Sequence, residues 1–330
     1  MNILVTGAAG YIGSVCSEVL IARGMSVIAL DSLLEGHRAA VPPSAIFCQV
    51  DLADRAQLEA VFSGYKIDAV MHFAGEALVA KSVREPSTFY AANVGCGVNL
   101  LDAVTRHGVR KFIFSSTAAT YGEPEIVPIP EDHRKAPINP YGKSKLVFEQ
   151  ILADYQVYTG LNYVTLRYFN AAGASAERGE HHRVETHLIP RVLDAAGGVL
   201  PDVDVFGTNY PTPDGTCVRD YIHVLDIADS HARALEEIDR VSGEAFNVGN
   251  SRGFSILEVL DVAERVTGRK IPRKLSPRRP GDPAVLVASK EKLKHLLGWE
   301  ASHSSLEEII QSAWAWKQKH PRGYADAASA

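Results

Sequence analysis

Two side chains that could transfer a proton, Tyr141 and Lys145, stand four residues apart. On a helix this spacing places both side chains on one face. A tyrosine that acts as a base must lose its proton well below its usual pKa of about 10. Lowering that pKa to about 7 requires roughly 4 kcal/mol, which an adjacent ammonium group and a positively charged ligand could supply. A packed tyrosine beside a solvated lysine is the alternative, and the spacing alone leaves both open.

A run of hydroxyl side chains, Ser115, Ser116 and Thr117, follows an apolar segment that predicts a strand. Open α/β sheets bind ligands at the carboxyl ends of their strands, which is where this run stands. A serine or threonine hydroxyl there could hydrogen-bond both a substrate hydroxyl and Tyr141. The alternative is a turn in which the hydroxyls only satisfy backbone groups.

Three glycines, Gly7, Gly10 and Gly13, lie between the first apolar run and a helical segment. Glycine lets the backbone turn tightly and approach a pyrophosphate, whose charge then meets the N-terminus of the helix. The spacing is G-x-x-G-x-x-G rather than the commoner G-x-G-x-x-G. We therefore predict a dinucleotide-binding loop, with a glycine-rich turn that binds nothing as the alternative.

The residues that follow the second and third apolar runs bear on the choice of dinucleotide. Asp31 ends the second run, where a carboxylate would accept hydrogen bonds from an adenosine ribose. No arginine or lysine follows until Arg38, so a 2′-phosphate has no evident partner and NAD is favoured over NADP. Asp51 and Leu52 suit the adenine edge, although a simple turn explains them nearly as well.

The hydrophobic pattern predicts the elements that position these groups. Nearly continuous apolar runs predict strands over residues 3–6, 26–30, 45–49, 69–73, 111–115 and 163–167. Helical spacing predicts helices over residues 11–23, 55–62, 88–107 and 141–159. This alternation is typical of an α/β fold, a Rossmann-type doubly wound parallel sheet covered on both faces.

The pattern changes near residue 169, after which glycine, proline and histidine become frequent. We expect a nucleotide-binding domain over residues 1–168 and a mainly substrate-binding domain over 169–330. Residues 245–249 could form a strand that returns to the first sheet. Helical spacing recurs over 256–268 and 305–319, and Ser304 with Glu307 predicts a capping box for the second of these helices.

Composition limits the class of protein. The 330 residues are 46% hydrophobic and 22% charged, which excludes disordered, collagen-like and coiled-coil chains. The net charge of -5 does not favour nucleic acid or an anionic membrane as a partner. The chain shows no apolar run of the roughly 18 residues that a membrane helix needs, and no secretion signal. Its four cysteines lack paired or metal-like spacing. We therefore expect a cytoplasmic protein with reduced thiols.

The glycine loop, Asp31, Thr117 and the Tyr141–Lys145 pair, in this order, are much more specific together than any one of them. With them the chain resembles, essentially end to end, the extended short-chain dehydrogenases/reductases, and among these the UDP-glucose 4-epimerase (UDP-galactose 4-epimerase) family. The segments that carry the resemblance cover residues 6–13, 73–75, 115–122, 141–145, 167–170, 214–223 and 278–282.

The resemblance implies an activity and an assembly. NAD would stay bound through the cycle, Tyr141 would take the proton of the sugar 4-hydroxyl, and the C4 hydride would pass to NAD. The 4-keto sugar would then rotate and receive the hydride on its other face. Thr117 would assist by hydrogen bonding, and Lys145 would hold the nicotinamide ribose and lower the pKa of Tyr141. The helices over 88–107 and 141–159 would pair across a two-fold axis in a homodimer.

The resemblance also implies two sets of binding residues. The NAD site would contain Gly7, Gly10, Tyr11, Ile12, Gly13, Asp31, Asp51, Leu52, Phe73, Ala74, Asn93, Ser115, Tyr141, Lys145 and Tyr168. The UDP-sugar site, in a smaller mixed α/β domain, would contain Thr117, Tyr141, Asn170, His187, Leu188, Arg219, Arg279 and Asp282. The arginines suit phosphate because they make planar, bidentate contacts.

The chain departs from the family pattern at three places. Ala77 stands where some members have a lysine, and Lys81 comes only later, which removes one cation expected to face the pyrophosphate. His187 stands where some members have asparagine. Val285 or Leu286 lies nearest to a bulky residue that limits the sugar pocket in some members.

Several other functions are weighed against this one. A 4,6-dehydratase needs an acid and a base beside the threonine, and Ala118 and Ala119 supply neither. A 4-epimerase or 4-reductase for another nucleotide sugar shares the same residues and stays open. A binding module without activity would typically have lost the tyrosine or the lysine. We predict no metal site, because the adjacent His181 and His182 do not place two ligands on one face. The isolated histidines are expected to be packed or capping, namely His72, His107, His223 and His231.

Overall fold

The computed structural model describes residues 1–279 and 282–325, so that residues 280 and 281 of the segment 278–282 lie outside the described part. Its largest element is a seven-stranded sheet in the order β10-β6-β5-β4-β1-β2-β3, with every neighbouring pair parallel. The strands are β1 (Asn2–Thr6), β2 (Ser26–Asp31), β3 (Ile46–Gln49), β4 (Ala69–His72), β5 (Lys111–Thr117), β6 (Asn162–Tyr168) and β10 (Ala245–Val248).

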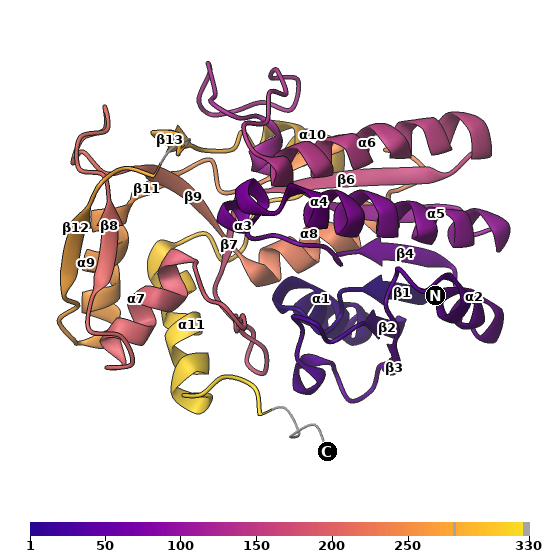
Figure 1. Cartoon of the computed structure of the whole chain (residues 1–330), viewed down its shortest axis with the longest axis horizontal. Helices are drawn as coiled ribbons and strands as arrows, with labels where there is room; N and C mark the ends of the chain where they lie inside the picture. Colours follow the sequence, from indigo (N-terminus) through magenta and orange to yellow (C-terminus); the bar gives the residue numbers. More distant parts are fainter. Residues whose placement is uncertain (280–281, 326–330) are drawn as a thin grey trace.

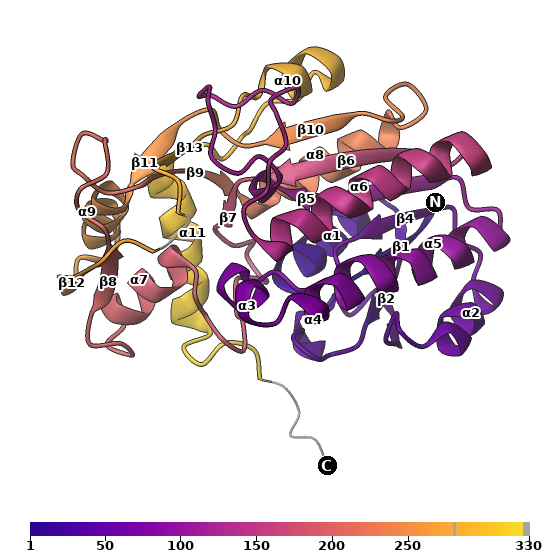
Figure 2. The same cartoon turned by 45° about the horizontal axis from the view of Figure 1, so that its top comes forward.

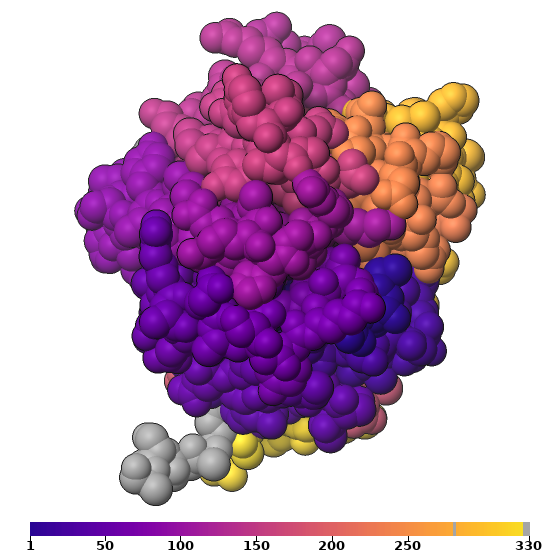
Figure 3. All heavy atoms as spheres, turned by 90° about the vertical axis from the view of Figure 1, so that its right-hand side faces the viewer, coloured from indigo at the N-terminus to yellow at the C-terminus, as the bar shows by residue number. Residues whose placement is uncertain are grey.

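Helices cover both faces of this sheet, as the apolar strands require (Figures 1 and 2). One core packs α1 (Tyr11–Ala22), α8 (Val224–Glu236) and α10 (Glu291–Leu297) against the sheet. A second core packs α2 (Arg55–Gly64), α5 (Cys96–Arg106) and α6 (Pro140–Thr159) against the other face. The predicted doubly wound α/β fold is therefore confirmed. The end of the molecule on the right of Figure 1 is formed mainly by the first half of the chain, as Figure 3 shows.

A smaller unit lies beside the carboxyl ends of the strands, on the left of Figure 1. Its core packs α7 (Leu188–Ala196), α9 (Ile256–Thr267) and α11 (Leu306–Lys319) together with short strands. In one sheet β9 (Val218–His223) pairs with β7 (Asn170–Ala172), β11 (Gly253–Ser255) and β13 (Val285–Leu286). In another, β8 (Val203–Phe206) pairs with β12 (Arg273–Ser276).

Local sequence explains where the site-bearing helix α6 begins and ends. Asn139 is its N-cap, and the Asn139 side chain accepts a hydrogen bond from the amide of Gly142 at 2.8 Å. Pro140 occupies the first turn, where its missing N–H costs nothing. Gly160 ends the helix in the left-handed conformation. These signals hold Tyr141 and Lys145 in the first two turns of the helix.

Two local predictions differ from the structure. The helix expected over 88–107 begins at Pro86 as α4 (Pro86–Tyr90), passes through a π-helical turn (Ala91–Gly95) and continues as α5. The N-cap of α11 is Ser305 rather than the expected Ser304, and its side chain accepts from the amide of Glu308 at 3.1 Å, while the Glu308 carboxylate pairs with His303. The remaining described elements are the short helix α3 (Val79–Arg84) and two 3₁₀ turns, Arg38–Ala40 and Ala118–Thr120. The strand expected over 245–249 forms as β10, over residues 245–248, and pairs with β6. Within the described residues no helix is long and apolar enough to cross a membrane.

Candidate active site

The glycine loop joins β1 to α1 next to the point where the strand order reverses, between β1 and β4. Gly7 has φ +71°, and a Cβ atom there would lie 2.6 Å from the amide nitrogen of Ala74. A Cβ atom on Gly13 would lie 2.2 Å from the carbonyl oxygen of Gly7. Both positions therefore need glycine, because the loop backbone packs directly on α1 and on the chain after β4.

The loop leaves the N-terminus of α1 ready for an anion. The helix begins at Tyr11 after Gly10, which offers no side chain to cap the first amides, and its first turn has no acidic residue. The first amides of a helix lack partners within it and favour negative charge. This geometry fits the pyrophosphate of a dinucleotide.

Asp31 lies at the carboxyl end of β2, against the glycine loop. Its carboxylate accepts from the amide of Ala9 at 2.9 Å and from the amide of Leu33 at 2.8 Å. Burial raises the pKa of Asp31, and the two amide hydrogen bonds oppose that rise. A carboxylate has about four acceptor positions, so two are left for ribose hydroxyls. Asp51, by contrast, accepts from the amide of Ala53 at 2.9 Å in an exposed turn.

A bracket of hydrogen bonds from Asn93 holds the loop that follows β4. Asn93 lies in the π-helical turn, accepts from the amide of Glu76 at 2.8 Å and donates to the Glu76 carbonyl at 3.0 Å. It also donates to the Ser144 hydroxyl on α6 at 2.9 Å. Gly75 is pressed against this side chain, since a Cβ atom there would lie 2.6 Å from Asn93 Oδ1 and 3.5 Å from Lys145 Nζ. Asn93 thus ties the loop to the helix that carries Lys145.

Lys145 is a buried cation on the inner face of α6. Its ammonium group donates to the carbonyl of Ser115 at 3.1 Å and lies 5.0 Å from the centre of the Phe114 ring. Burial lowers the pKa of Lys145 to about 8, and the charge of Glu149 opposes this. The ammonium group is therefore held at the carboxyl end of β5, next to the loop that Asn93 holds.

Tyr141 and Thr117 meet at the same strand end. The Tyr141 hydroxyl is hydrogen-bonded to Thr117, and its ring packs edge-on to Phe89 with centres 6.4 Å apart. Burial raises the pKa of Tyr141, and the bond to Thr117 offsets this only in part. The expectation that Lys145 lowers this pKa stays a prediction: the ammonium group donates to the Ser115 carbonyl, and burial is the largest influence on the pKa of Tyr141.

The remaining residues expected to bind NAD surround these groups. Tyr11 donates its hydroxyl to the Gly173 carbonyl at 2.6 Å, which links α1 to the chain after β7. The hydroxyl of Tyr168 bonds to the imidazole of His231, against which the Phe73 ring packs with centres 4.8 Å apart. Others of the set are placed by backbone contacts or apolar packing, namely Ile12, Leu52 and Ala74.

Of the isolated histidines, His72, His223 and His231 are buried as expected, whereas His107 is exposed and pairs with Glu59 at 2.6 Å. His72 is buried beside Phe114 and Phe148 and bonds to the hydroxyl of Thr6 at 2.7 Å. Burial lowers its pKa to about 3. His223 caps α8 by accepting from the amide of Leu225 at 3.1 Å.

The residues expected to bind the UDP-sugar gather on the smaller unit. Asn170, on β7, donates to the Asp220 carbonyl at 3.0 Å, and β7 lies beside β9. Arg219, on β9, forms an ion pair with Asp282. Arg279 stacks its guanidinium group on the Phe206 ring, 3.9 Å from the centre. The structure thus brings Arg219 and Asp282 into direct contact, although the sequence alone indicates them only as separate ligands.

The positions that depart from the family pattern also have defined places. Lys81 lies on α3 and pairs with Glu76 at 3.0 Å, at the loop after β4. Val285 and Leu286 form β13 and pair with Val218 and Arg219 of β9. The residues nearest to the family's bulky position therefore lie on β13, directly beside the strand that carries Arg219.

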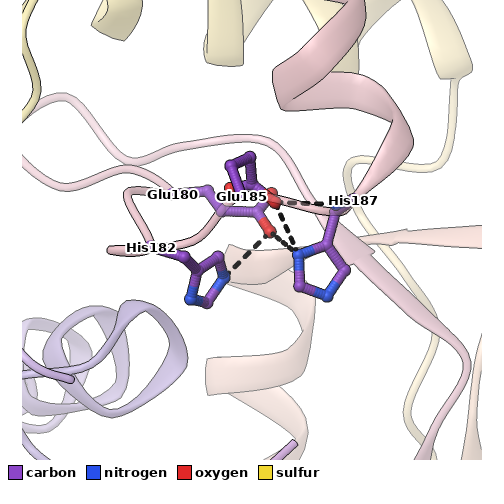
Figure 4. Close-up of side chains that lie close together, drawn as sticks. All are labelled: Glu180, His182, Glu185 and His187. Atoms are coloured by element: carbon purple, nitrogen blue, oxygen red, sulfur yellow. Dashed lines mark hydrogen bonds and ion pairs between the residues drawn. The ribbon is translucent and has the colours of Figure 1, made fainter. Parts of the chain in front are cut away.

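His187, expected to contact uridine, belongs to a cluster that sequence reasoning missed. It is the N-cap of α7, directly before Leu188, and its Nδ1 lies 3.1 Å from Glu180 and 2.9 Å from Glu185. His182 lies 3.1 Å from the same Glu180 oxygen (Figure 4). The cluster therefore includes His182 and does not include its neighbour His181. The spacing E-x-H-x-x-E-x-H over residues 180–187 could have revealed it.

A second missed feature is the buried ion pair of Glu149 and Arg167, 2.6 Å apart. Glu149 also accepts from the Ser116 hydroxyl at 2.5 Å, and Arg167 donates to the Tyr121 hydroxyl at 2.9 Å. Glu149 stands four residues after Lys145, so it extends the face of α6 that carries the predicted catalytic pair. This network links the end of β5, through Ser116, to α6 and β6.

Comparisons with known proteins agree with this geometry. The model of the NAD dependent epimerase/dehydratase family matches residues 3–249. A UDP-glucose 4-epimerase of Lacticaseibacillus casei is 47% identical over 329 residues, which cover 99% of each chain. The crystal structure of a Brucella ovis UDP-glucose 4-epimerase in complex with NAD is 45% identical with a TM-score of 0.92, covering 95% of this chain and 97% of that one.

A Bifidobacterium longum UDP-glucose 4-epimerase in complex with NAD+ and UDP is 38% identical with a TM-score of 0.93. The match covers 98% of this chain and 100% of that chain. These likenesses confirm the resemblance stated from the motifs. The family model covers most of the chain and the relatives align nearly end to end, so the chain belongs to the NAD dependent epimerase/dehydratase family.

Proposed function

We propose that the protein interconverts UDP-galactose and UDP-glucose by moving a hydride from sugar C4 to bound NAD and back to the opposite face. The observation that carries this is the pairing of Tyr141 with Thr117 at the end of β5, the strand whose Ser115 carbonyl accepts from the Lys145 ammonium group. All three groups lie at the carboxyl end of β5, next to the glycine loop that fits a dinucleotide. The likeness to UDP-glucose 4-epimerases over nearly the whole chain supports the choice of sugar.

Tyr141 is the acid–base group in this account. Its hydroxyl takes the proton of the sugar 4-hydroxyl as the hydride leaves C4, and gives it back after the 4-keto sugar has rotated. Thr117 holds the 4-hydroxyl and the Tyr141 oxygen in one hydrogen-bonded line. General acid–base catalysis of this kind contributes roughly 10²–10⁴-fold to a rate. Bound NAD supplies the hydride acceptor and donor.

The charge of Lys145 serves this proton transfer from within the protein. An ammonium group near the phenol favours the ionised form, while burial works against it. In the protein alone burial prevails and the pKa of Tyr141 is raised. We therefore infer that Lys145 would hold the nicotinamide ribose and that the positive charge of bound NAD would favour the ionised form of Tyr141.

Other residues hold the two ligands. Those expected at the NAD site keep that role here, with Gly7 and Gly13 at the pyrophosphate, Asp31 at the adenosine ribose and Asn93 holding the loop. For the UDP-sugar we propose Asn170, His187, Leu188, Arg219, Arg279 and Asp282. Because Arg219 already pairs with Asp282, a diphosphate must share the guanidinium group, whose five donors allow this.

Conversion of UDP-galactose without added nicotinamide nucleotide tests the proposal. Purified protein is mixed with UDP-galactose, and the anomeric signals are followed by NMR. UDP-glucose should appear and approach an equilibrium mixture, and Tyr141→Phe should abolish this. If nothing converts even after NAD is supplied, the sugar assignment is wrong, and pentose, uronate and 4-keto sugar nucleotides are tried next.

We further propose that the protein is a cytoplasmic homodimer. Helices α5 and α6 lie side by side on one face with apolar side chains partly exposed (Figure 2). Val147 on α6 is 36% exposed, and Tyr90, at the end of α4, is 40% exposed. All four cysteines are free thiols, as a reducing compartment allows.

A further inference from the structure

Four side chains from a single segment converge at the start of α7. Glu180, His182, Glu185 and His187 each offer one ligand atom, and these atoms all lie within 4.8 Å of one another. Figure 4 shows the two imidazole rings turned toward the Glu180 carboxylate from different sides. The Glu180 oxygen is 3.1 Å from His182 Nε2 and 3.1 Å from His187 Nδ1, and Glu185 is 2.9 Å from His187 Nδ1.

The donor set suits a divalent transition-metal ion. Two imidazole nitrogens and two carboxylate oxygens are ligands that zinc accepts, at about 2.0–2.2 Å in tetrahedral geometry. Ligands at that distance lie about 3.3 Å from one another. The two contacts of Glu180 and the contact of Glu185 with His187, at 2.9–3.1 Å, are close to this separation. With both imidazoles neutral the cluster carries two negative charges, which match a divalent cation. Small side-chain movements would therefore convert the hydrogen bonds into metal bonds.

The surrounding structure already holds the ligands in place. The Glu180 side chain is 7% exposed, so water has little access to the carboxylate that the histidines share. Tyr324 fixes the segment just before the cluster by donating to the Gly179 carbonyl at 3.2 Å, while α7 fixes His187. Four ligands within eight residues also require little ordering of the chain.

We propose that Glu180, His182, Glu185 and His187 bind one divalent transition-metal ion, with Zn²⁺ as the probe. The ion would join the segment after β7 to the first turn of α7. None of its four ligands takes part in the proposed hydride and proton transfer at Tyr141, and the site shares His187 with the residues proposed to bind the UDP-sugar. The alternative is a cluster held by protons alone, in which the imidazoles donate to the two carboxylates.

Binding of Zn²⁺ and Co²⁺ to the purified, NAD-containing protein tests the site. UDP-sugars are left out because diphosphates bind these ions themselves. Calorimetry counts the Zn²⁺ ions, and the visible absorption of Co²⁺ reports the nitrogen and oxygen ligands. The variants are His182→Asn and Glu185→Gln, and His181→Asn is the matched control because it changes the neighbouring histidine outside the cluster.

The wild type and His181→Asn should bind one ion that each cluster variant binds about 100-fold more weakly or not at all, since even changes beyond the ligands cost 10–100-fold. Zn²⁺ should also raise the Tm of the wild type by several degrees and leave that of Glu185→Gln unchanged. Equal binding by all four proteins, or no binding at millimolar Zn²⁺, overturns the proposal. Circular dichroism of the metal-free proteins checks the fold, and Glu185→Gln keeps the side-chain shape if His182→Asn fails to fold.

Discussion

At the scale of single residues, the site depends on positions where a few atoms decide whether a ligand fits. The Gly13 position is the tightest of these, because a Cβ atom would lie 2.2 Å from the Gly7 carbonyl oxygen. The Gly7 carbonyl is a backbone group, so it cannot move aside as easily as the end of a flexible side chain. The loop must therefore move if Gly13 gains a methyl group, and its amides would then lose the position proposed for binding the pyrophosphate.

We expect Gly13→Ala to lose bound NAD and to lower conversion of UDP-galactose at least tenfold. Gly64→Ala is the matched control, since a Cβ atom there meets nothing within 4 Å and alanine favours the helix by about 0.5–1 kcal/mol. Absorbance of the purified proteins and of their denatured supernatants measures the NAD retained. Full NAD content in Gly13→Ala would show that the loop does not bind the dinucleotide as described.

The buried His72 makes stability depend on pH in a defined direction. Its pKa is about 3 in the folded protein and about 6.5 in the unfolded chain. Between these values the unfolded chain binds a proton that the folded protein does not, so the free energy of unfolding falls as the pH falls from 6.5 toward 3. The loss attributable to His72 is about 2 kcal/mol between pH 6.5 and pH 5.

We expect His72→Leu to lose about 2 kcal/mol less stability than the wild type between pH 6.5 and pH 5. Urea unfolding at the two pH values measures the difference, which is independent of any constant cost of the substitution. The same loss in both proteins would mean that His72 is charged or exposed in the folded state.

Residue types and their spacing are enough to predict much of the site. Thr117 stands at the end of β5 and Tyr141 and Lys145 at the start of α6, as the sequence indicates, and their catalytic roles stay predictions. The pKa of Tyr141 could not be predicted, because it depends on how deeply the ring is buried and on where the Lys145 ammonium group points. The cluster around Glu180 was missed because only the adjacent His181 and His182 were considered as ligands, although the spacing over residues 180–187 could have revealed it.

At the scale of elements, the π-helical turn between α4 and α5 directs Asn93 inward. An extra residue in that turn shifts the side chains that follow, and such turns are often found at functional sites. Hydrophobic spacing predicted one regular helix over 88–107 because the interruption leaves the apolar pattern nearly intact. Because the π-helical turn points Asn93 inward, its side chain can hydrogen-bond both to the loop after β4 and to Ser144 on α6.

We expect Asn93→Ala to lower stability by about 1–3 kcal/mol, because it leaves the amide and carbonyl of Glu76 without their partner. It should also raise the KM for the UDP-sugar less than it lowers kcat, since Asn93 also holds Ser144, the residue before Lys145 on α6. Asn99→Ala, which removes partly exposed bonds to Leu52 and Arg55, is the control and should do little. Equal effects of the two variants would contradict the bracket.

At the scale of the whole molecule, the sheet could be predicted because buried parallel strands are written as short, nearly continuous apolar runs. The strands of the smaller unit were harder to predict from the sequence. Strands such as β7, β11 and β13 have two or three residues, too few to show a period, and they pair with β9 from distant parts of the chain. The ion pair of Arg219 and Asp282 depends on that pairing, and so did not follow from the sequence.

The proposed homodimer is tested at this scale. We expect light scattering to give twice the mass of the chain for the wild type and a single mass for Val147→Glu, because a charge would be buried in the apolar face of α6. Val199→Glu, at a position 63% exposed on the smaller unit, should remain dimeric. A wild type that stays monomeric at all concentrations would rule the dimer out.

The return of the same hydride to the same carbon is the central claim of the account, and a deuterium label tests it most directly. UDP-galactose carrying deuterium at C4 is converted in ordinary water, and the UDP-glucose formed is analysed by NMR and mass spectrometry. We predict that the deuterium stays at C4 of the product, since the hydride never exchanges with water. Loss of the label to solvent, with conversion otherwise intact, would contradict hydride transfer and point to removal of the C4 hydrogen as a proton.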